Sequence, residues 1–248
     1  MQNTFNLLLL KYTLPIILIG LFSCDKAFLD SGSEVSREII ISEPFTALRF
    51  NNIFDVTLVQ DTVNKVIFTC GENLQPYVSA EIKENMLIFN HTEKNNWSRK
   101  YKHIQVEIHV VAIPSIHIYS PISLKTIGVL KGSSFWLCDF GKFSDVNVTV
   151  DVKACSVFMT SDNFGLFKIN GKADKTELWG WGSAVVRTDS LIAQSCHVKH
   201  RGFSDIYVNV VNQLNVSLEF TGNIVCVSKP QTIVIEKKIS SGSLIIKE

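Results

Sequence analysis

The feature that most constrains this chain is a set of positions in its C-terminal half that recurs with a period of about 20 residues. Gly182, Gly202 and Gly222 are evenly spaced at this period, with Asp162 one period before them. Asp is among the residues that tolerate the left-handed backbone open to Gly. Two further columns of the frame are apolar throughout: Cys138, Phe158, Leu178, Val198 and Leu218, and then Val146, Leu166, Val186, Ile206 and Cys226. Because only 46% of all residues are hydrophobic, ten apolar residues in ten positions indicate a structural repeat.

Between these columns, apolar and polar residues alternate along the chain. Residues 146–153 and 104–110 both follow this pattern, which is typical of β-strands with one buried face. No stretch after the N-terminal segment that ends at Cys24 shows the helical period of about 3.6 residues. The sequence therefore predicts an all-β protein.

This period, combined with strand patterning, predicts a right-handed parallel β-helix, since parallel crossovers are nearly always right-handed. Successive coils would stack at about 4.8 Å, with equivalent residues lying over one another. Residues 38 to about 120 do not obey the frame, so we expect a less regular β-rich N-terminal part. The alternative is an antiparallel sandwich, which would give alternation without so regular a column.

The segment from Met1 to Cys24 has the pattern of an export signal. Lys11 precedes an apolar run over residues 14–22, which is too short to span a bilayer. The run ends in Leu21-Phe22-Ser23-Cys24, which resembles a bacterial lipobox, whose cysteine receives lipid. We therefore expect a lipoprotein signal peptide over 1–24 that ends at Cys24, a tether over 25–37 and one domain over 38–248. The alternatives are a plain signal peptide and an uncleaved anchor in which Cys24 has no role.

Charge and cysteine content exclude several classes of partner. The net charge is +1, from 24 basic and 23 acidic side chains. A chain this close to neutral shows no excess of basic residues that would indicate binding to nucleic acid. The five cysteines after Cys24 are odd in number and show no Cys-x-x-Cys spacing: Cys70, Cys138, Cys155, Cys196 and Cys226. They lie in apolar runs, where free cysteine behaves as a small hydrophobe. We expect buried thiols and no cofactor.

Four segments in the N-terminal half resemble one known family. Residues 45–60 (FTALRFNNIFDVTLVQ) are similar to the opening motif of the auto-transporter adhesin head GIN domain family, and residues 71–74, 85–88 and 113–116 are similar to its next three segments. The resemblance covers residues 38–235, although the family's Gly-Ser-Gly-Asp turns are degenerate here. It implies a β-helix in a Gram-negative cell envelope, held in the outer membrane by lipid, and it supplies no catalytic residues.

Two acidic residues occupy equivalent positions of the repeat, Asp145 and Asp205. Three coils would separate them by roughly 14 Å, whereas paired glycosidase carboxylates lie about 5–9.5 Å apart. We expect both to be turn residues that accept bonds from nearby backbone N–H groups.

A metal site is similarly disfavoured. Cys196, His197 and His200 are residue types that bind zinc. On a strand, however, Cys196 and His200 share one face while His197 points the other way. We expect no metal there, but a packed cysteine and two surface or corner histidines. His109 and His117 fall on the polar side of their strands and are expected to be solvated.

Aromatic residues are the candidate ligand-binding groups. Trp179 and Trp181 alternate with Leu178 and so are expected to face outward. Trp136 and Tyr207 also lie in or near the repeats, and Trp97 and Tyr101 lie in the polar stretch over residues 90–103. Because such rings stack on sugars and anchor interfaces, Trp179 and Trp181 are the candidate ligand-binding pair.

The sequence thus favours a non-enzymatic, adhesin-like binding or structural module with a glycan or envelope protein as partner. The alternative is a carbohydrate-active enzyme of the β-helix class, a polysaccharide lyase or glycosidase. A groove with two carboxylates within about 10 Å would favour that enzyme. No acidic run follows Cys24, which favours the periplasmic side of the outer membrane.

Overall fold

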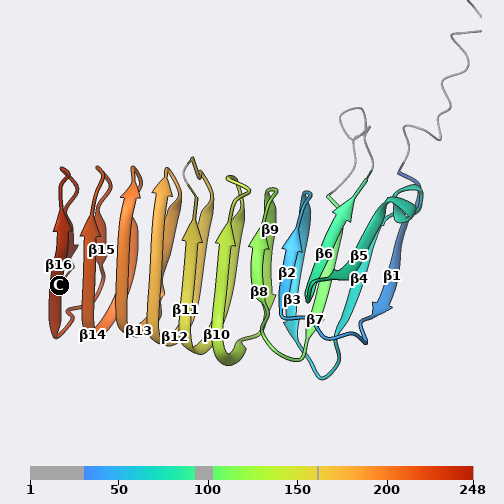
Figure 1. Cartoon of the computed structure of the whole chain (residues 1–248), viewed down its shortest axis with the longest axis horizontal. Helices are drawn as coiled ribbons and strands as arrows, with labels where there is room; N and C mark the ends of the chain where they lie inside the picture. Colours follow the sequence, from blue (N-terminus) through green and yellow to red (C-terminus); the bar gives the residue numbers. More distant parts are fainter. Residues whose placement is uncertain (1–30, 93–102, 161, 248) are drawn as a thin grey trace, which may run out of the picture.

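In the computed structural model, which describes residues 31–92, 103–160 and 162–247, the chain winds into an elongated stack of β-coils (Figure 1). The 17 strands of the described residues belong to a single sheet. The predicted all-β fold and the β-helix with about 20 residues per coil are confirmed. The same residues include no helix long and apolar enough to cross a membrane.

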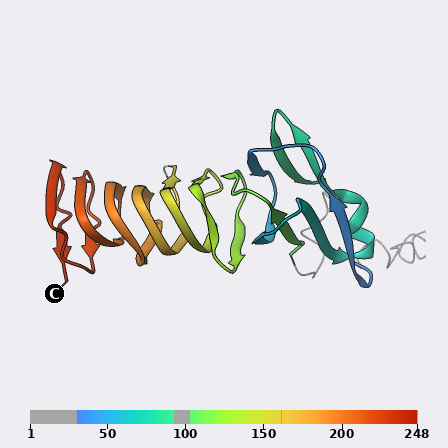
Figure 2. The same cartoon turned by 90° about the horizontal axis from the view of Figure 1, so that it is seen from below.

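The regular part of the stack consists of long strands that pair in parallel with the next coil. These strands are β10 (Leu130–Asp139), β11 (Asp145–Met159), β12 (Leu166–Gly182), β13 (Val185–Gly202), β14 (Ile206–Leu218), β15 (Ile224–Cys226), β16 (Thr232–Lys238) and β17 (Leu244–Ile246). Each of β11 to β14 bends midway, so its first and second halves lie on different faces of the solenoid. Figure 2 shows the resulting turns following one another to the C terminus.

The N-terminal part adds strands to the same two faces and then departs from the pattern. It comprises β1 (Glu34–Ile40), β2 (Ala47–Phe50), β3 (Phe54–Gln60), β4 (Lys65–Gly71), the 3₁₀ helix η1 (Glu72–Tyr77), β5 (Val78–Lys83), β6 (Met86–His91), β7 (Gln105–Val110), β8 (Ser115–Ile118) and β9 (Ile122–Ile127). Strand β2 pairs in parallel with β6 and β8, and β3 with β7 and β9. The pairs β1–β4, β4–β7 and β5–β6 are antiparallel. The less regular start is therefore a mixed, curled sheet.

We call the two faces of the solenoid face A and face B. Face A contains β2, β6, β8, the second halves of β10 to β14, and β16; face B contains β3, β7, β9, the first halves of β11 to β14, β15 and β17. Strand β1 begins at Glu34, so residues 34–37, the end of the segment expected to be a tether, already form part of a strand.

The core is a set of ladders in which one apolar side chain lies over the next. The ladder behind face A is fully buried, each member having 0% exposure: Ile116, Leu137, Val157, Leu178, Val198 and Val216. The step along the chain between partners is shortest from Val198 to Val216, and it is longest, and equal, from Ile116 to Leu137 and from Val157 to Leu178. The sequence period is therefore an average of unequal coils rather than a fixed repeat.

This variation makes part of the predicted core wrong. Cys138 pairs with Phe158, and Phe158 pairs with Trp179 instead of Leu178. In the second column Phe167 takes the buried position expected for Leu166. Because side chains alternate between faces, a slip of one residue turns a side chain from the core to the outside. Cys138 and Phe158 therefore lie on the outer side of face A.

The turns at the ends of the β10, β11 and β12 strands on face A need an unusual backbone. Lys142, Asp162 and Gly182, which are evenly spaced along the chain, have φ of 74°, 65° and 62°, which confirms the left-handed conformation expected at Asp162. Gly202 is needed for a different reason, since a Cβ there would lie 2.7 Å from the carbonyl oxygen of Gly182. These four positions thus recur at the same point of successive turns, although their backbone angles differ.

The polar content of the core is small but specific. All five cysteines after Cys24 are free and buried, as predicted. His200 is 2% exposed and pairs with Leu218, so its expected surface position is wrong. Its Nδ1 accepts a hydrogen bond from the N–H of Gly202 at 3.1 Å, and a side chain at Gly222 would collide with its Nε2. His200 therefore fills the space that two glycines leave open.

The Leu178→Ala substitution tests the ladder behind face A. Removing this buried side chain leaves a cavity between Val157 and Val198, so the free energy of unfolding should fall by about 2–5 kcal/mol. Lys175→Ala, on the same strand but exposed, should change it by no more than about 0.5 kcal/mol. Chemical denaturation measures both; equal losses would contradict the ladder.

His200 should make the protein less stable in mild acid. Burial lowers the pKa of His200, so the unfolded chain takes up a proton at a higher pH than the folded one. Stability is then complete above the unfolded pKa of about 6.5 and declines as the pH falls below it, by at most about 1.4 kcal/mol per pH unit.

Denaturation curves of the wild type and His200→Gln between about pH 7.5 and about pH 5 measure this effect. The variant should be less stable at the higher pH but lose less stability on acidification. Parallel pH profiles for the two proteins would show that His200 is not the group responsible.

Candidate ligand-binding groove

The register of β10 to β12 brings four large aromatic residues together on face A. Trp136, Phe158 and Trp179 follow or precede members of the buried ladder by one residue, and so point outward. Trp181 lies two residues beyond Trp179 on the same side. The outward direction predicted for Trp179 and Trp181 is confirmed, and both are partly buried rather than fully exposed.

These rings pack against one another in a file that runs from coil to coil. The ring centroids of Trp136 and Phe158 are 5.7 Å apart, and those of Phe158 and Trp179 are 5.0 Å apart with the planes at 81°. At the N-terminal end of the file, His117 lies 4.8 Å from Trp136. His117 is therefore a packed ring and not the solvated side chain that the strand pattern predicts, and burial lowers its pKa.

The file borders a groove of about 560 Å³, which we call the aromatic groove. Its lining is Trp136, Cys138, Phe158, Met159, Thr160, Trp179 and Trp181. Cations stand over the C-terminal rings: Lys199 Nζ is 4.5 Å from the ring centroid of Trp179, and the Arg201 guanidinium carbon is 4.9 Å from that of Trp181. The groove is thus apolar inside and basic along one rim.

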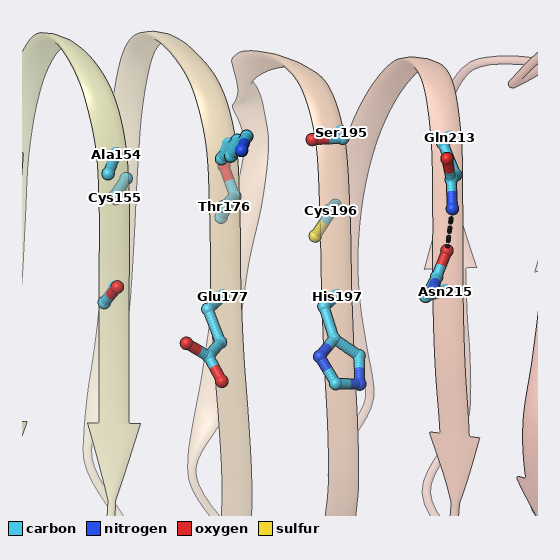
Figure 3. Close-up of a pocket in the computed structure, with 11 residues that line it drawn as sticks. Ala154, Cys155, Thr176, Glu177, Ser195, Cys196, His197, Gln213 and Asn215 are labelled. Atoms are coloured by element: carbon cyan, nitrogen blue, oxygen red, sulfur yellow. Dashed lines mark hydrogen bonds between the residues drawn. The ribbon is translucent and has the colours of Figure 1, made fainter.

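A second, polar pocket of about 440 Å³ adjoins the file on face A (Figure 3). Its sides are polar and come from four successive coils: Ser156, Lys175, Glu177, Ser195, His197, Gln213 and Asn215. Figure 3 shows Glu177 and His197 beside each other on neighbouring strands. Glu177 Oε1 accepts a hydrogen bond of 2.9 Å from Trp179 Nε1, so one carboxylate links this pocket to the aromatic file.

The floor of the polar pocket is chemically inert. It consists of Cys155, Thr176 and Cys196, which form one ladder. Burial raises the pKa of the Cys155 thiol to about 12 and also raises that of Cys196. Both residues are therefore protonated at neutral pH and lack the thiolate that a nucleophile requires.

The other candidates from the sequence do not assemble into a site. Asp145 and Asp205 stand three coils apart, as expected, and Asp205 accepts hydrogen bonds from the backbone and side chain of Asn223. His197 points away from Cys196 and bonds to Glu236 at 3.0 Å. In the described part of the chain, no group of three or more His, Cys, Asp or Glu could hold a metal ion.

His109 and Tyr207 have partners outside the groove. His109 is not solvated, since its two ring nitrogens lie 2.7 Å from Asp61 and Glu107 carboxylate oxygens. Tyr207 is on face B, with the Arg187 guanidinium 4.6 Å from its ring centroid. Cys24, Trp97 and Tyr101 lie outside the described residues.

Sequence reasoning missed Phe158, which joins the tryptophans into one file. Every residue of 157–159 is apolar, so alternation could not tell the inward side from the outward side. The available signal was Trp136, which lies on the same side of its strand as Cys138, the residue one period before Phe158.

Comparisons with known structures show the fold. A putative adhesin from Bacteroides fragilis matches with a TM-score of 0.76 at 14% identity, over 86% of this chain and 97% of that one. Putative adhesins from Parabacteroides distasonis and Parabacteroides merdae match with TM-scores of 0.63 and 0.58 at 17% and 15% identity. They cover 87% and 88% of this chain, and 97% of each of the two structures.

A search of curated proteins gives no match. A family model does match, over residues 44–230, and these include the opening motif, the aromatic file and most of the solenoid. The resemblance seen in the N-terminal segments is therefore confirmed. The chain belongs to the family described as putative auto-transporter adhesin, head GIN domain.

Proposed function

We propose that this protein is a non-enzymatic binding module of the bacterial cell envelope whose ligand occupies the aromatic groove. The observation that carries the proposal is the file of Trp136, Phe158 and Trp179, with Trp181 beside it, on the outer side of face A. Outward rings of this size are not needed for the core, which the ladder of Val157 and Leu178 already fills. Partly desolvated aromatic residues with polar neighbours are typical of binding hot spots.

The chemistry of the groove and its neighbour favours a glycan as ligand. A sugar ring has an apolar C–H face that packs on aromatic rings and hydroxyl groups around its rim. Here the rings lie beside a strip that offers a carboxylate, an amide and an imidazole, from Glu177, Asn215 and His197. Because both rows repeat at the coil spacing of about 4.8 Å, an extended oligosaccharide could lie along the solenoid axis and meet similar groups at each step.

The alternative, a carbohydrate-active enzyme, has less support. Among the described residues that line the two pockets, Glu177 is the one carboxylate, and it is held by Trp179 Nε1. The glycosidase mechanism uses two carboxyl groups flanking the scissile bond. We therefore propose recognition without cleavage.

The proposal includes a lipid anchor on Cys24, supported by the lipobox-like residues before it and by the family's envelope setting. Mass spectrometry of the mature chain should find a diacylated N-terminal Cys24. Cys24→Ser should move the protein from the membrane fraction to the soluble fraction, because the acyl chains supply most of the membrane affinity. An unmodified N terminus elsewhere in the chain would contradict the anchor.

Trp179→Ala with Trp181→Ala tests the groove. On a glycan array, the wild type should bind a subset of oligosaccharides, and the double variant should bind them at least about tenfold more weakly because two stacking faces are lost. Tyr207→Ala removes an outward aromatic residue from face B and should leave binding unchanged.

Thermal unfolding of all three proteins separates lost binding from lost structure. Equal binding by the wild type and the tryptophan variant would refute the groove as the site. Release of shortened oligosaccharides by the wild type would favour the enzyme instead.

A further inference from the structure

We propose that a second surface, along one edge of the solenoid, rests on a lipid bilayer. The surface consists of side chains in the turns that follow the face A strands, and we call it the phenylalanine edge. Its members are Phe140, Phe143, Phe164, Phe203, Phe220 and Ile239, with exposed fractions between 39% and 67%. None of them lines the aromatic groove, so this surface is separate from the proposed ligand site.

The phenylalanine edge is built into the coil register. Phe164 N donates to Lys142 O, Ser183 N to Asn163 O, and Phe203 N to Gly182 O. Phe143, Phe164, Ser183 and Phe203 therefore occupy one position in successive turns. Phe143 stacks on Phe164 at 5.2 Å, and Phe203 meets Phe220 edge-on at 4.7 Å. Since these backbone donors are already paired, the turn tips can leave water without exposing unsatisfied amides.

Several charged residues near this edge have partners of opposite sign. Glu219 bonds to Arg201 at 3.0 Å and to Lys237 at 2.8 Å. Lys142 and Asp162 face each other at 3.8 Å. Pairing lowers the cost of bringing such groups close to an apolar medium.

The opposite edge, where β11 to β14 bend, is different. It exposes charged side chains at successive coils, among them Asp151, Lys153, Asp174 and Lys175. It also exposes aliphatic residues, among them Ile127, Val129, Ile192 and Val211, but none of the exposed aromatic rings of the described residues. One edge of the solenoid therefore suits water and the other an apolar surface.

The shape of the phenylalanine edge favours lipid over a protein partner. The side chains form a narrow row on protruding turns, about five coil spacings long, or about 24 Å. A stable protein interface buries about 800 Å² on each partner, which a row of tips offers poorly to a rigid surface. A bilayer deforms around each tip, and its binding strength scales with the apolar area buried.

The position at which the described chain begins also favours a lipid bilayer at the phenylalanine edge. Ser31 O accepts a hydrogen bond from Asn73 N, and β1 starts beside Gly71 at the end of β4. In Figure 1 the described chain begins at the upper edge, to which β12, β13 and β16 also point. Seven residues from Cys24 to Ser31 reach at most about 25 Å. If the proposed lipid is on Cys24, it therefore enters the bilayer on the side of the phenylalanine edge.

The test uses residues 24–248 with Cys24→Ser, so that no acyl chain contributes, and unilamellar vesicles of phosphatidylethanolamine and phosphatidylglycerol. The otherwise unchanged chain should cosediment with vesicles. Phe143→Ser with Phe203→Ser should lower the partition coefficient by about tenfold or more, because two apolar tips are removed. Ile127→Ser with Ile192→Ser, a matched loss of apolar residues at the opposite edge, should not change it.

A gain of binding provides a second test, which does not depend on the loss of an activity. Ser183 is the polar member of the Phe143 column, and Ser183→Phe should raise the partition coefficient several-fold. No cosedimentation of the unchanged chain, or equal cosedimentation of the two serine double variants, would overturn the proposal. Analytical ultracentrifugation could also overturn it. If the unchanged chain is a dimer and the phenylalanine double variant is a monomer, the edge joins two copies of the chain.

These experiments test the proposed lipid binding and the proposed glycan binding separately. The tryptophan double variant should bind vesicles normally, and the phenylalanine double variant should bind glycans normally. Loss of both activities in either variant would show that the two surfaces are one site.

Discussion

The whole molecule depends on the parallel hydrogen-bond register between neighbouring coils. The long strands in the middle of the regular part pair along most of their length with the coil before and the coil after, as β12 does with β11 and β13. The register decides which side chains lie over one another, and the alternation of side chains then decides which of these columns are buried. The core, the aromatic groove and the phenylalanine edge are three columns of the same arrangement.

Register also explains how a repetitive scaffold acquires a specific site. The step from Val157 to Leu178 is one residue longer than the next, from Leu178 to Val198. Phe158 already points outward, because Val157 beside it pairs with the buried Leu137 of the preceding coil. With the shorter step, Leu178 would lie over Phe158 on the outer side and Trp179 would turn inward. The additional residue keeps Leu178 in the buried ladder and places Trp179 over Phe158. A small change of coil length thus decides which residues join the core and which the outer surface.

The same physics sets the limit of what the sequence could predict. The fold was accessible because inward columns must be apolar in every coil, so Leu178 and Val198 leave a periodic signal. The left-handed turn at Asp162 was accessible because few residue types tolerate it. The outward position of Phe158 could not be predicted from the sequence. Its neighbours on the strand are also apolar, so the alternation pattern does not show which of these residues face the core. The antiparallel strands β1, β4 and β5 share no period with the coils, so their pairing left no trace in the repeat.

The turn phenylalanines escaped notice for a related reason, and they connect the two proposed surfaces. Sequence analysis assigns apolar residues to the core by default, and only the structure shows that Phe143 and Phe203 project from turns. Trp181 lies one residue before Gly182, where the turn begins. The aromatic groove therefore opens on face A next to the phenylalanine edge. With that edge on a bilayer, the solenoid axis lies along the membrane and the groove faces sideways, close to the lipid surface. A ligand held there would run parallel to the membrane, an orientation that suits a polymer layered over it better than a molecule approaching from a distance.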